Sequence, residues 1–128
     1  MQDFRNLEVW QKAHEFALAV YQITRGFPED ERFGLTSQLR RSVASIGANL
    51  AEGCGRGTDA EFARYVQIAM GSASEVEYHL LPAKDLTYMH AAQYPDLQEE
   101  ITRVKRMLAS LLKTLNSKRP PAPLADSR

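Results

Sequence analysis

The sequence lacks the features of a secreted, membrane-spanning or strongly basic protein. Its 128 residues include one cysteine, so no internal disulfide can form, and 16 basic residues offset 16 acidic ones. No apolar run is long enough to cross a bilayer, and charges stand in the first residues, where a signal segment would be apolar. We therefore expect a reduced, cytoplasmic protein with no membrane partner. The neutral charge balance gives no global argument for nucleic acid binding.

Helical periodicity is the main feature that the sequence does have. Apolar residues recur every three or four positions in four segments, and no segment has the alternating pattern of a strand. Because proline removes a backbone donor, Pro82 is expected to kink or end the third segment. The four predicted helices cover about residues 7–25, 36–52, 58–89 and 94–115.

Four amphipathic helices bury their apolar stripes most simply when they pack against one another. We therefore predict an all-α fold, an antiparallel up-down four-helix bundle. The chain length fits one domain, which we expect to span residues 1–117. The proline-rich residues 118–128 are expected to form a flexible tail.

The second predicted helix has a core stripe led by Leu39, Ile46 and Leu50, and a second surface of small residues. Small side chains let another helix approach closely, so we interpret this second surface as an oligomer interface. The alternative is a solvated face on which alanine is simply a good helix former, but a glycine in mid-helix costs about 1 kcal/mol relative to alanine and argues against it. The small residues are Ala44, Gly47, Ala48 and Ala51.

Three polar residues of the same predicted helix are expected to contribute to its packing. Arg41 and Glu52 share an outward sector and are expected to meet partner subunits. Asn49 lies on the flank of the core stripe, where a buried amide would have to be hydrogen-bonded and could fix the helix register.

The sequence offers little for catalysis. The three histidines, His14, His79 and His90, lie in separate segments without metal-ligand spacing. Cys54 lies between two glycines, in a stretch expected to form a loop, and has no evident base. The glycine-rich stretch 53–57 follows no strand and lacks the ending of a phosphate loop. We predict no enzyme activity, no cofactor and no metal site.

Positive charge gathers in the last predicted helix. Between residues 101 and 119 there are six basic residues and no acidic one. Rows of Lys and Arg supply sequence-independent affinity for nucleic acid. The alternative is an ordinary solvated face, since cations near a helix C-terminus are stabilising and no aromatic residues interleave to stack bases. The candidate nucleic-acid-binding residues are Arg103, Lys105, Arg106 and Lys113.

The centre of the chain resembles a known family. Residues 38–53 read QLRRSVASIGANLAEG, and matching blocks follow at 61–65 (EFARY), 71–75 (GSASE) and 83–86 (AKDL). With the opening FRNLEVW at residues 4–10, these blocks are similar to the four-helix bundle family of 23S ribosomal RNA intervening sequences. The resemblance covers about residues 4–115.

This resemblance implies an antiparallel bundle that assembles as a ring-like homopentamer and has no catalytic residues. The chain is also similar to the accessory variability protein of diversity-generating retroelements, which works with a reverse transcriptase and RNA through a basic surface. We therefore predict a non-enzymatic, oligomeric bundle that binds RNA or a nucleic-acid-handling protein, such as a reverse-transcriptase-like protein, through basic patches. The alternative is a protein-interaction scaffold that binds no nucleic acid.

Overall fold

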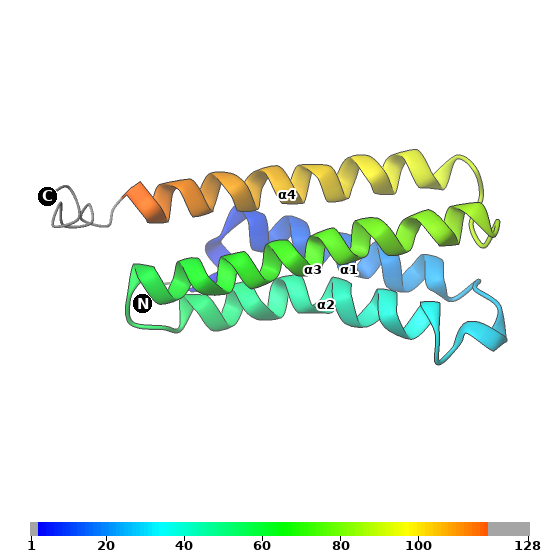
Figure 1. Ribbon diagram of the computed structural model, residues 1–128, viewed down its shortest axis with the longest axis horizontal. Helices are drawn as coiled ribbons and strands as arrows, with labels where there is room; N and C mark the ends of the chain where they lie inside the picture. The colour runs from blue at the N-terminus through cyan, green and yellow to red at the C-terminus, as the bar shows by residue number, and fades with distance from the viewer. Residues whose placement is uncertain (1–2, 118–128) are drawn as a thin grey trace, which may run out of the picture.

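The computed structural model describes residues 3–117, which form four long helices and no strand. Successive helices run in opposite directions, so the predicted all-α four-helix fold is confirmed (Figure 1). The predicted tail, residues 118–128, lies outside the described residues. The helices are α1 (Glu8–Thr24), α2 (Leu35–Cys54), α3 (Asp59–Asp85) and α4 (Gln93–Ser117), with short 3-10 turns η1 (Phe4–Asn6) and η2 (Glu29–Glu31).

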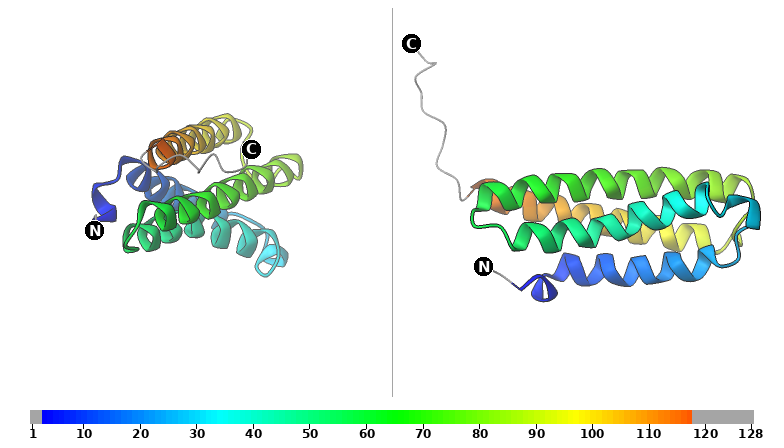
Figure 2. Two further views of the ribbon diagram at one scale, coloured as in Figure 1. Left: turned by 60° about the vertical axis from the view of Figure 1, so that its left-hand side comes forward. Right: turned by 90° about the horizontal axis from the view of Figure 1, so that it is seen from below.

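Each helix lies beside two neighbours, and within the described residues no Cα atoms of the two diagonal pairs come within 8 Å of each other. α2 and α4 both contact α1 and α3, and the four helices lie along one long axis (Figure 2). The predicted stripes meet in the centre, where full burial of a large apolar side chain contributes about 1.5–3 kcal/mol. The largest fully buried side chains include Phe16, Leu39, Ile46, Leu50, Leu80, Ile101 and Leu108.

The helix starts are set by side chains that accept backbone hydrogen bonds. Thr58 Oγ1 accepts from the Glu61 amide at 3.1 Å and so caps the start of α3. Glu31 Oε1 accepts from the Leu35 amide at 3.0 Å and so begins α2. The other carboxylate oxygen of Glu31 accepts from the Tyr88 hydroxyl at 2.8 Å, which joins the two connections at this end of the bundle. These bonds, with that from Leu35 the largest cause, hold the pKa of Glu31 below its usual value.

The end of α3 differs from the prediction. Pro82 lies inside the helix, but α3 stops at Asp85 and does not continue toward Met89. Thr87 adopts a left-handed backbone with φ of 60°, and the Tyr88 and Thr87 amides donate back to the carbonyls of Ala83 and Lys84. This is the hydrogen-bond pattern that reverses a chain after a helix, usually with glycine at the left-handed position. Periodicity alone could not reveal it because threonine is rarely found there.

Polar contacts fix α2 against its neighbours. Ser45 Oγ and Ser72 Oγ lie 2.8 Å apart across α2 and α3, and Arg40 Nε donates to Thr24 Oγ1 of α1 at 2.8 Å. Asn49 is half-buried rather than buried, and its amide donates to Ser45 of its own helix. Within the described residues Asn49 forms no hydrogen bond to another helix, so its link to α3 runs through Ser45, which bonds Ser72.

Gly53 allows α2 and α3 to approach closely next to their connection. A β-carbon at Gly53 would lie 2.8 Å from Phe62 Cδ1 and 2.8 Å from Tyr65 Cβ, which is closer than carbon atoms can pack. Gly53 and Cys54 belong to α2, which extends two residues beyond the predicted end of this helix. The first residues of the predicted glycine-rich loop are therefore helical, and Gly53 packs against α3.

We predict opposite effects for alanine at two helical glycines. Gly53→Ala should lower the free energy of unfolding by about 1–2 kcal/mol, because the new methyl group overpacks the α2–α3 contact. Gly71→Ala is the matched control: its β-carbon would meet nothing within 4 Å, so it should raise the free energy of unfolding by up to about 1 kcal/mol. Urea denaturation measures both. If Gly53→Ala is as stable as Gly71→Ala, the close contact is wrong.

Candidate interaction surfaces

The described residues contain no group of three or more His, Cys, Asp or Glu side chains that could hold a metal ion. On α3, His79 Nε2 lies 3.3 Å from Glu75 Oε2, which makes a pair and not a group of three. Cys54 was expected in a loop, but it is the last residue of α2 and only 4% exposed. Burial, with the charge of Asp3 as a smaller cause, raises the pKa of its thiol and makes it less nucleophilic. None of the helices between residues 3 and 117 is long and apolar enough to span a membrane.

An apolar groove of about 400 Å³ runs along the outside of α1 and α2. Its α1 side includes Leu18 and Tyr21, which are 55% and 39% exposed. Trp10 stacks on His14 with ring centroids 4.9 Å apart and meets Phe4 edge to face. We call this feature the α1–α2 groove; it is lined by Phe4, Trp10, Ala13, His14, Ala17, Leu18, Tyr21, Val43, Ala44, Gly47, Ala48 and Ala51.

The predicted small-residue surface of α2 forms the second wall of this groove. Ala44 and Ala48 are exposed, whereas Gly47 and Ala51 are half-buried. Part of the cover comes from the same chain, since a β-carbon at Gly47 would lie 3.3 Å from Trp10 Nε1. Gly47 thus accommodates an indole of α1, a role that the spacing within α2 could not show. The remaining surface is open in the single chain.

The two polar residues expected at the interface have different surroundings. Arg41 is exposed and has no ion pair within residues 3–117. Glu52 is engaged within its own chain: Glu52 Oε2 accepts from Arg56 at 2.8 Å and from the Tyr65 hydroxyl at 3.2 Å. Neither residue lines the α1–α2 groove.

The candidate nucleic-acid-binding residues of α4 fall into two groups. Arg103, Arg106 and Lys113 are exposed, and within residues 3–117 none of them forms an ion pair or hydrogen bond. We call these three residues the basic face. Asp96, Glu99 and Glu100 lie earlier on α4, so negative charge is confined to the first half of the helix.

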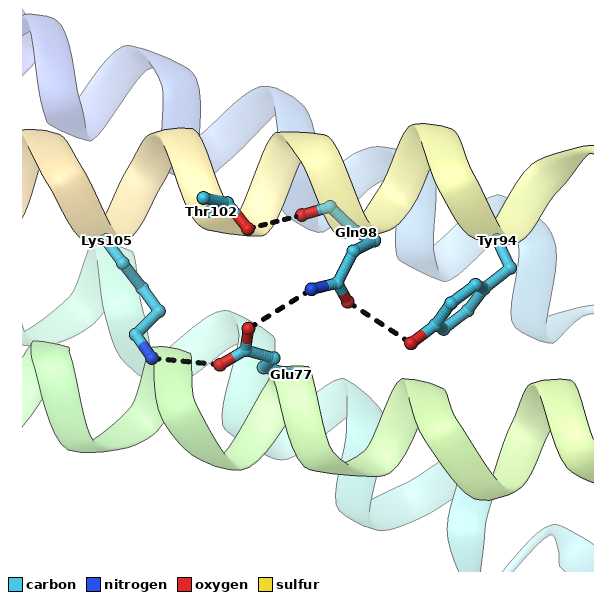
Figure 3. Close-up of polar contacts among 5 residues, drawn as sticks. All are labelled: Glu77, Tyr94, Gln98, Thr102 and Lys105. Carbon is cyan, nitrogen blue, oxygen red and sulfur yellow. Dashed lines mark hydrogen bonds and ion pairs between the residues drawn. The ribbon is translucent and has the colours of Figure 1, made fainter.

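Lys105 belongs to an interhelical network instead. Lys105 Nζ lies 2.9 Å from Glu77 Oε1 of α3, and the two side chains are 30% and 34% exposed (Figure 3). Gln98 donates to the other oxygen of Glu77 at 3.3 Å and accepts from the Tyr94 hydroxyl at 3.3 Å. The hydrogen bond from Lys105, opposed by partial burial, holds the pKa of Glu77 below its usual value. The charge of Lys105 is therefore largely neutralised.

The fold and these surfaces define a helical-bundle protein with an apolar groove and a basic helix face. The chain belongs to the 23S rRNA-intervening sequence protein family, which matches residues 5–110. It is also similar to the crystal structure of a protein with unknown function from the S23 ribosomal protein family of Bacteroides thetaiotaomicron, at 30% identity and a TM-score of 0.75. That match covers 82% of this chain and 95% of the other. No curated protein matches significantly.

We predict that the Lys105–Glu77 pair makes the stability of the bundle depend on pH. Since the folded-state pKa of Glu77 is depressed, its contribution is present above the ordinary value of 4.5 and is lost as the pH falls below it. Lys105→Met should therefore lower the free energy of unfolding by about 1 kcal/mol at pH 7 and by less at pH 3. Lys113→Met, at an exposed and unpaired lysine, should change it by less than about 0.5 kcal/mol at either pH. Equal losses from the two variants at pH 7 would contradict this.

Proposed function

We propose that this protein is a non-enzymatic RNA-binding bundle that works as an oligomer. The basic face of α4 contacts phosphates of the RNA backbone, and the α1–α2 groove packs against another copy of the chain. RNA binding and self-association use separate surfaces, because the groove lies on α1 and α2 and the basic face lies on α4. The family description, which concerns an intervening sequence of 23S rRNA, agrees with an RNA partner.

The observation that carries the RNA-binding proposal is the set of unneutralised cations on α4. Arg103 and Lys113 are ten residues apart, which is about 15 Å along a helix, so the basic face extends over several phosphates. The helix dipole favours cations only within the last turn of a helix. The last turn of α4 has no basic residue. The dipole therefore does not account for the basic face, and this supports a role in phosphate binding.

Two properties of the α1–α2 groove support self-association. The groove is almost wholly apolar and includes exposed large side chains, which monomeric proteins rarely gather in one place. Its α2 wall is made of small residues that allow a neighbouring helix to approach closely. Assembly would bring several modest basic faces together on one particle, and linked weak sites bind far more tightly than one site. The homopentamer implied by the family resemblance would present five.

The RNA-binding prediction is tested by titrating a structured RNA with the full chain at increasing salt. Wild-type affinity should fall linearly on a double-logarithmic plot, because each phosphate contact releases counterions. Arg106→Glu plus Lys113→Glu should weaken binding on the order of tenfold or more at low salt and make the slope shallower by roughly 1.4–1.8, the contribution of two contacts.

The matched control reverses two exposed arginines near the other end of the bundle. Arg25→Glu plus Arg32→Glu changes the net charge by the same amount and should leave the salt slope close to that of the wild type. Binding that is indifferent to salt, or equal losses from both double variants, would contradict a specific basic face. The protein-interaction scaffold, which the apolar groove also supports, would then be the better account.

The self-association prediction is tested by light scattering. The wild-type chain should have a mass several times 14.4 kDa. Ala48→Arg places a long charged side chain in the α1–α2 groove and should reduce that mass. Ala19→Arg, at an exposed alanine of α1 that does not line the groove, should not. A wild-type monomer, or an assembly that Ala48→Arg leaves intact, would remove the interface from the proposal.

A further inference from the structure

The outer side of α3 presents a second set of exposed apolar side chains. Ile68, Tyr78 and Leu81 are 41%, 63% and 40% exposed. With Gly71 and Glu75 between them, these residues follow one another at intervals of three or four positions, so they share one side of the helix. We call the five residues the α3 face. None of them lines the α1–α2 groove.

Gly71 lies near the middle of the α3 face and has no explanation within the single chain. A glycine inside a helix costs about 1 kcal/mol relative to alanine. A β-carbon at Gly71 would meet nothing within 4 Å, so the fold alone gives glycine no advantage over alanine there. A helix surface without a side chain lets another helix approach closely. Gly71 therefore suits the α3 face for contact with a helix of another molecule.

The α3 face and the α1–α2 groove match in length and complement each other in shape. At about 1.5 Å per residue, Trp10 and Tyr21 of the groove are about 16 Å apart along α1. Ile68 and Tyr78 are about 15 Å apart along α3. The groove is a hollow with small residues along its α2 wall, whereas the α3 face carries large apolar side chains on either side of Gly71. The large side chains can therefore fill the hollow.

The two surfaces also carry opposite charges that lack a strong partner in their own chain. Arg41 is exposed, has no ion pair within residues 3–117, and lies one turn before Ala44 of the groove. The side chain of Glu75 is 46% exposed, and within the described residues its polar contact is with His79, at 3.3 Å. A cation beside the groove and an anion on the α3 face are complementary.

Arg41 and Glu75 lie at about the same height along the bundle. The helices α2 and α3 run in opposite directions, and Ser45 Oγ of α2 lies 2.8 Å from Ser72 Oγ of α3 (Figure 1). Arg41 stands four residues before Ser45, and Glu75 stands three residues after Ser72, so the two are nearly level. When copies stand side by side with their long axes parallel around one symmetry axis, residues that meet across a contact are level in this way.

We propose that the α1–α2 groove of one copy receives the α3 face of the next, with Arg41 paired to Glu75 and Ala48 close to Gly71. This inference rests on the proposed self-association and adds to it the element that fills the groove. The contact joins two different surfaces, so each copy binds one neighbour through its groove and another through its α3 face. Head-to-tail contacts of this kind form a ring when the rotation closes. The basic face of α4 belongs to neither surface.

The test mixes two variants of the full chain, each with one of the two surfaces blocked. Ala48→Arg blocks the groove, and Gly71→Arg blocks the α3 face at a position that is open within its own chain. In light scattering each variant alone should lose the wild-type assembly. An equimolar mixture should form a species of about twice 14.4 kDa, joined through one intact groove and one intact α3 face. Ala19→Arg introduces the same side chain outside both surfaces and should keep the wild-type mass.

A charge exchange tests the ion pair separately. Arg41→Glu and Glu75→Arg each place like charges across the contact, so each should raise the concentration at which the assembly half dissociates by about three- to tenfold. The double variant restores the pair with its charges exchanged and should return to within about twofold of the wild type. Dilution series followed by light scattering measure these concentrations.

The outcomes separate the inference from the proposed function. If the wild-type chain is a monomer, or Ala48→Arg leaves the assembly intact, the proposed self-association fails and the inference fails with it. If Ala48→Arg dissociates the assembly and Gly71→Arg does not, the groove survives and the α3 face is overturned. A mixture of the two variants that forms no dimer, or a double charge variant as weak as the single ones, also overturns the pairing.

Discussion

Burial of one apolar stripe from each helix is the constraint on which both candidate surfaces depend. With Leu39, Ile46 and Leu50 of α2 turned inward, the small residues of that helix must lie toward α1. With Ile101 and Leu108 of α4 turned inward, its unpaired cations must point outward. The core therefore does more than stabilise the fold, because it also determines which side chains the bundle presents to a partner.

Charge neutralisation separates the basic residues of the bundle into two groups. Lys105 and Arg56 face carboxylates across short distances and serve to hold helices and connections in place. The basic face and Arg64 have no such partner within the described residues, although acidic side chains occur on the same helices. Because the chain as a whole has no net charge, the proposed RNA affinity would have to come from this local imbalance.

The sequence predicts the helices and their stripes well, because a long amphipathic helix has a strong periodic signal. It predicts contacts between helices poorly. The small-residue surface was identified, but its partial cover by Trp10 was not, since Trp10 fits the apolar arc of its own helix equally well. Lys105 and Arg106 are neighbours in sequence, and only the position of Glu77 on α3 distinguishes the paired lysine from the free arginine. The left-handed backbone of Thr87, which ends α3 early, could not be predicted either, because threonine is not a residue type typical of turns.

The central claim is that the unpaired cations of α4 form an RNA-binding surface apart from the α1–α2 groove. Hydrogen–deuterium exchange of the full chain with and without a structured RNA tests it most directly. The account predicts RNA-dependent protection in peptides covering residues 101–113, with no change in residues 10–21 and 44–51, which border the groove. Protection confined to the groove peptides, or no RNA-dependent protection at all, would contradict it.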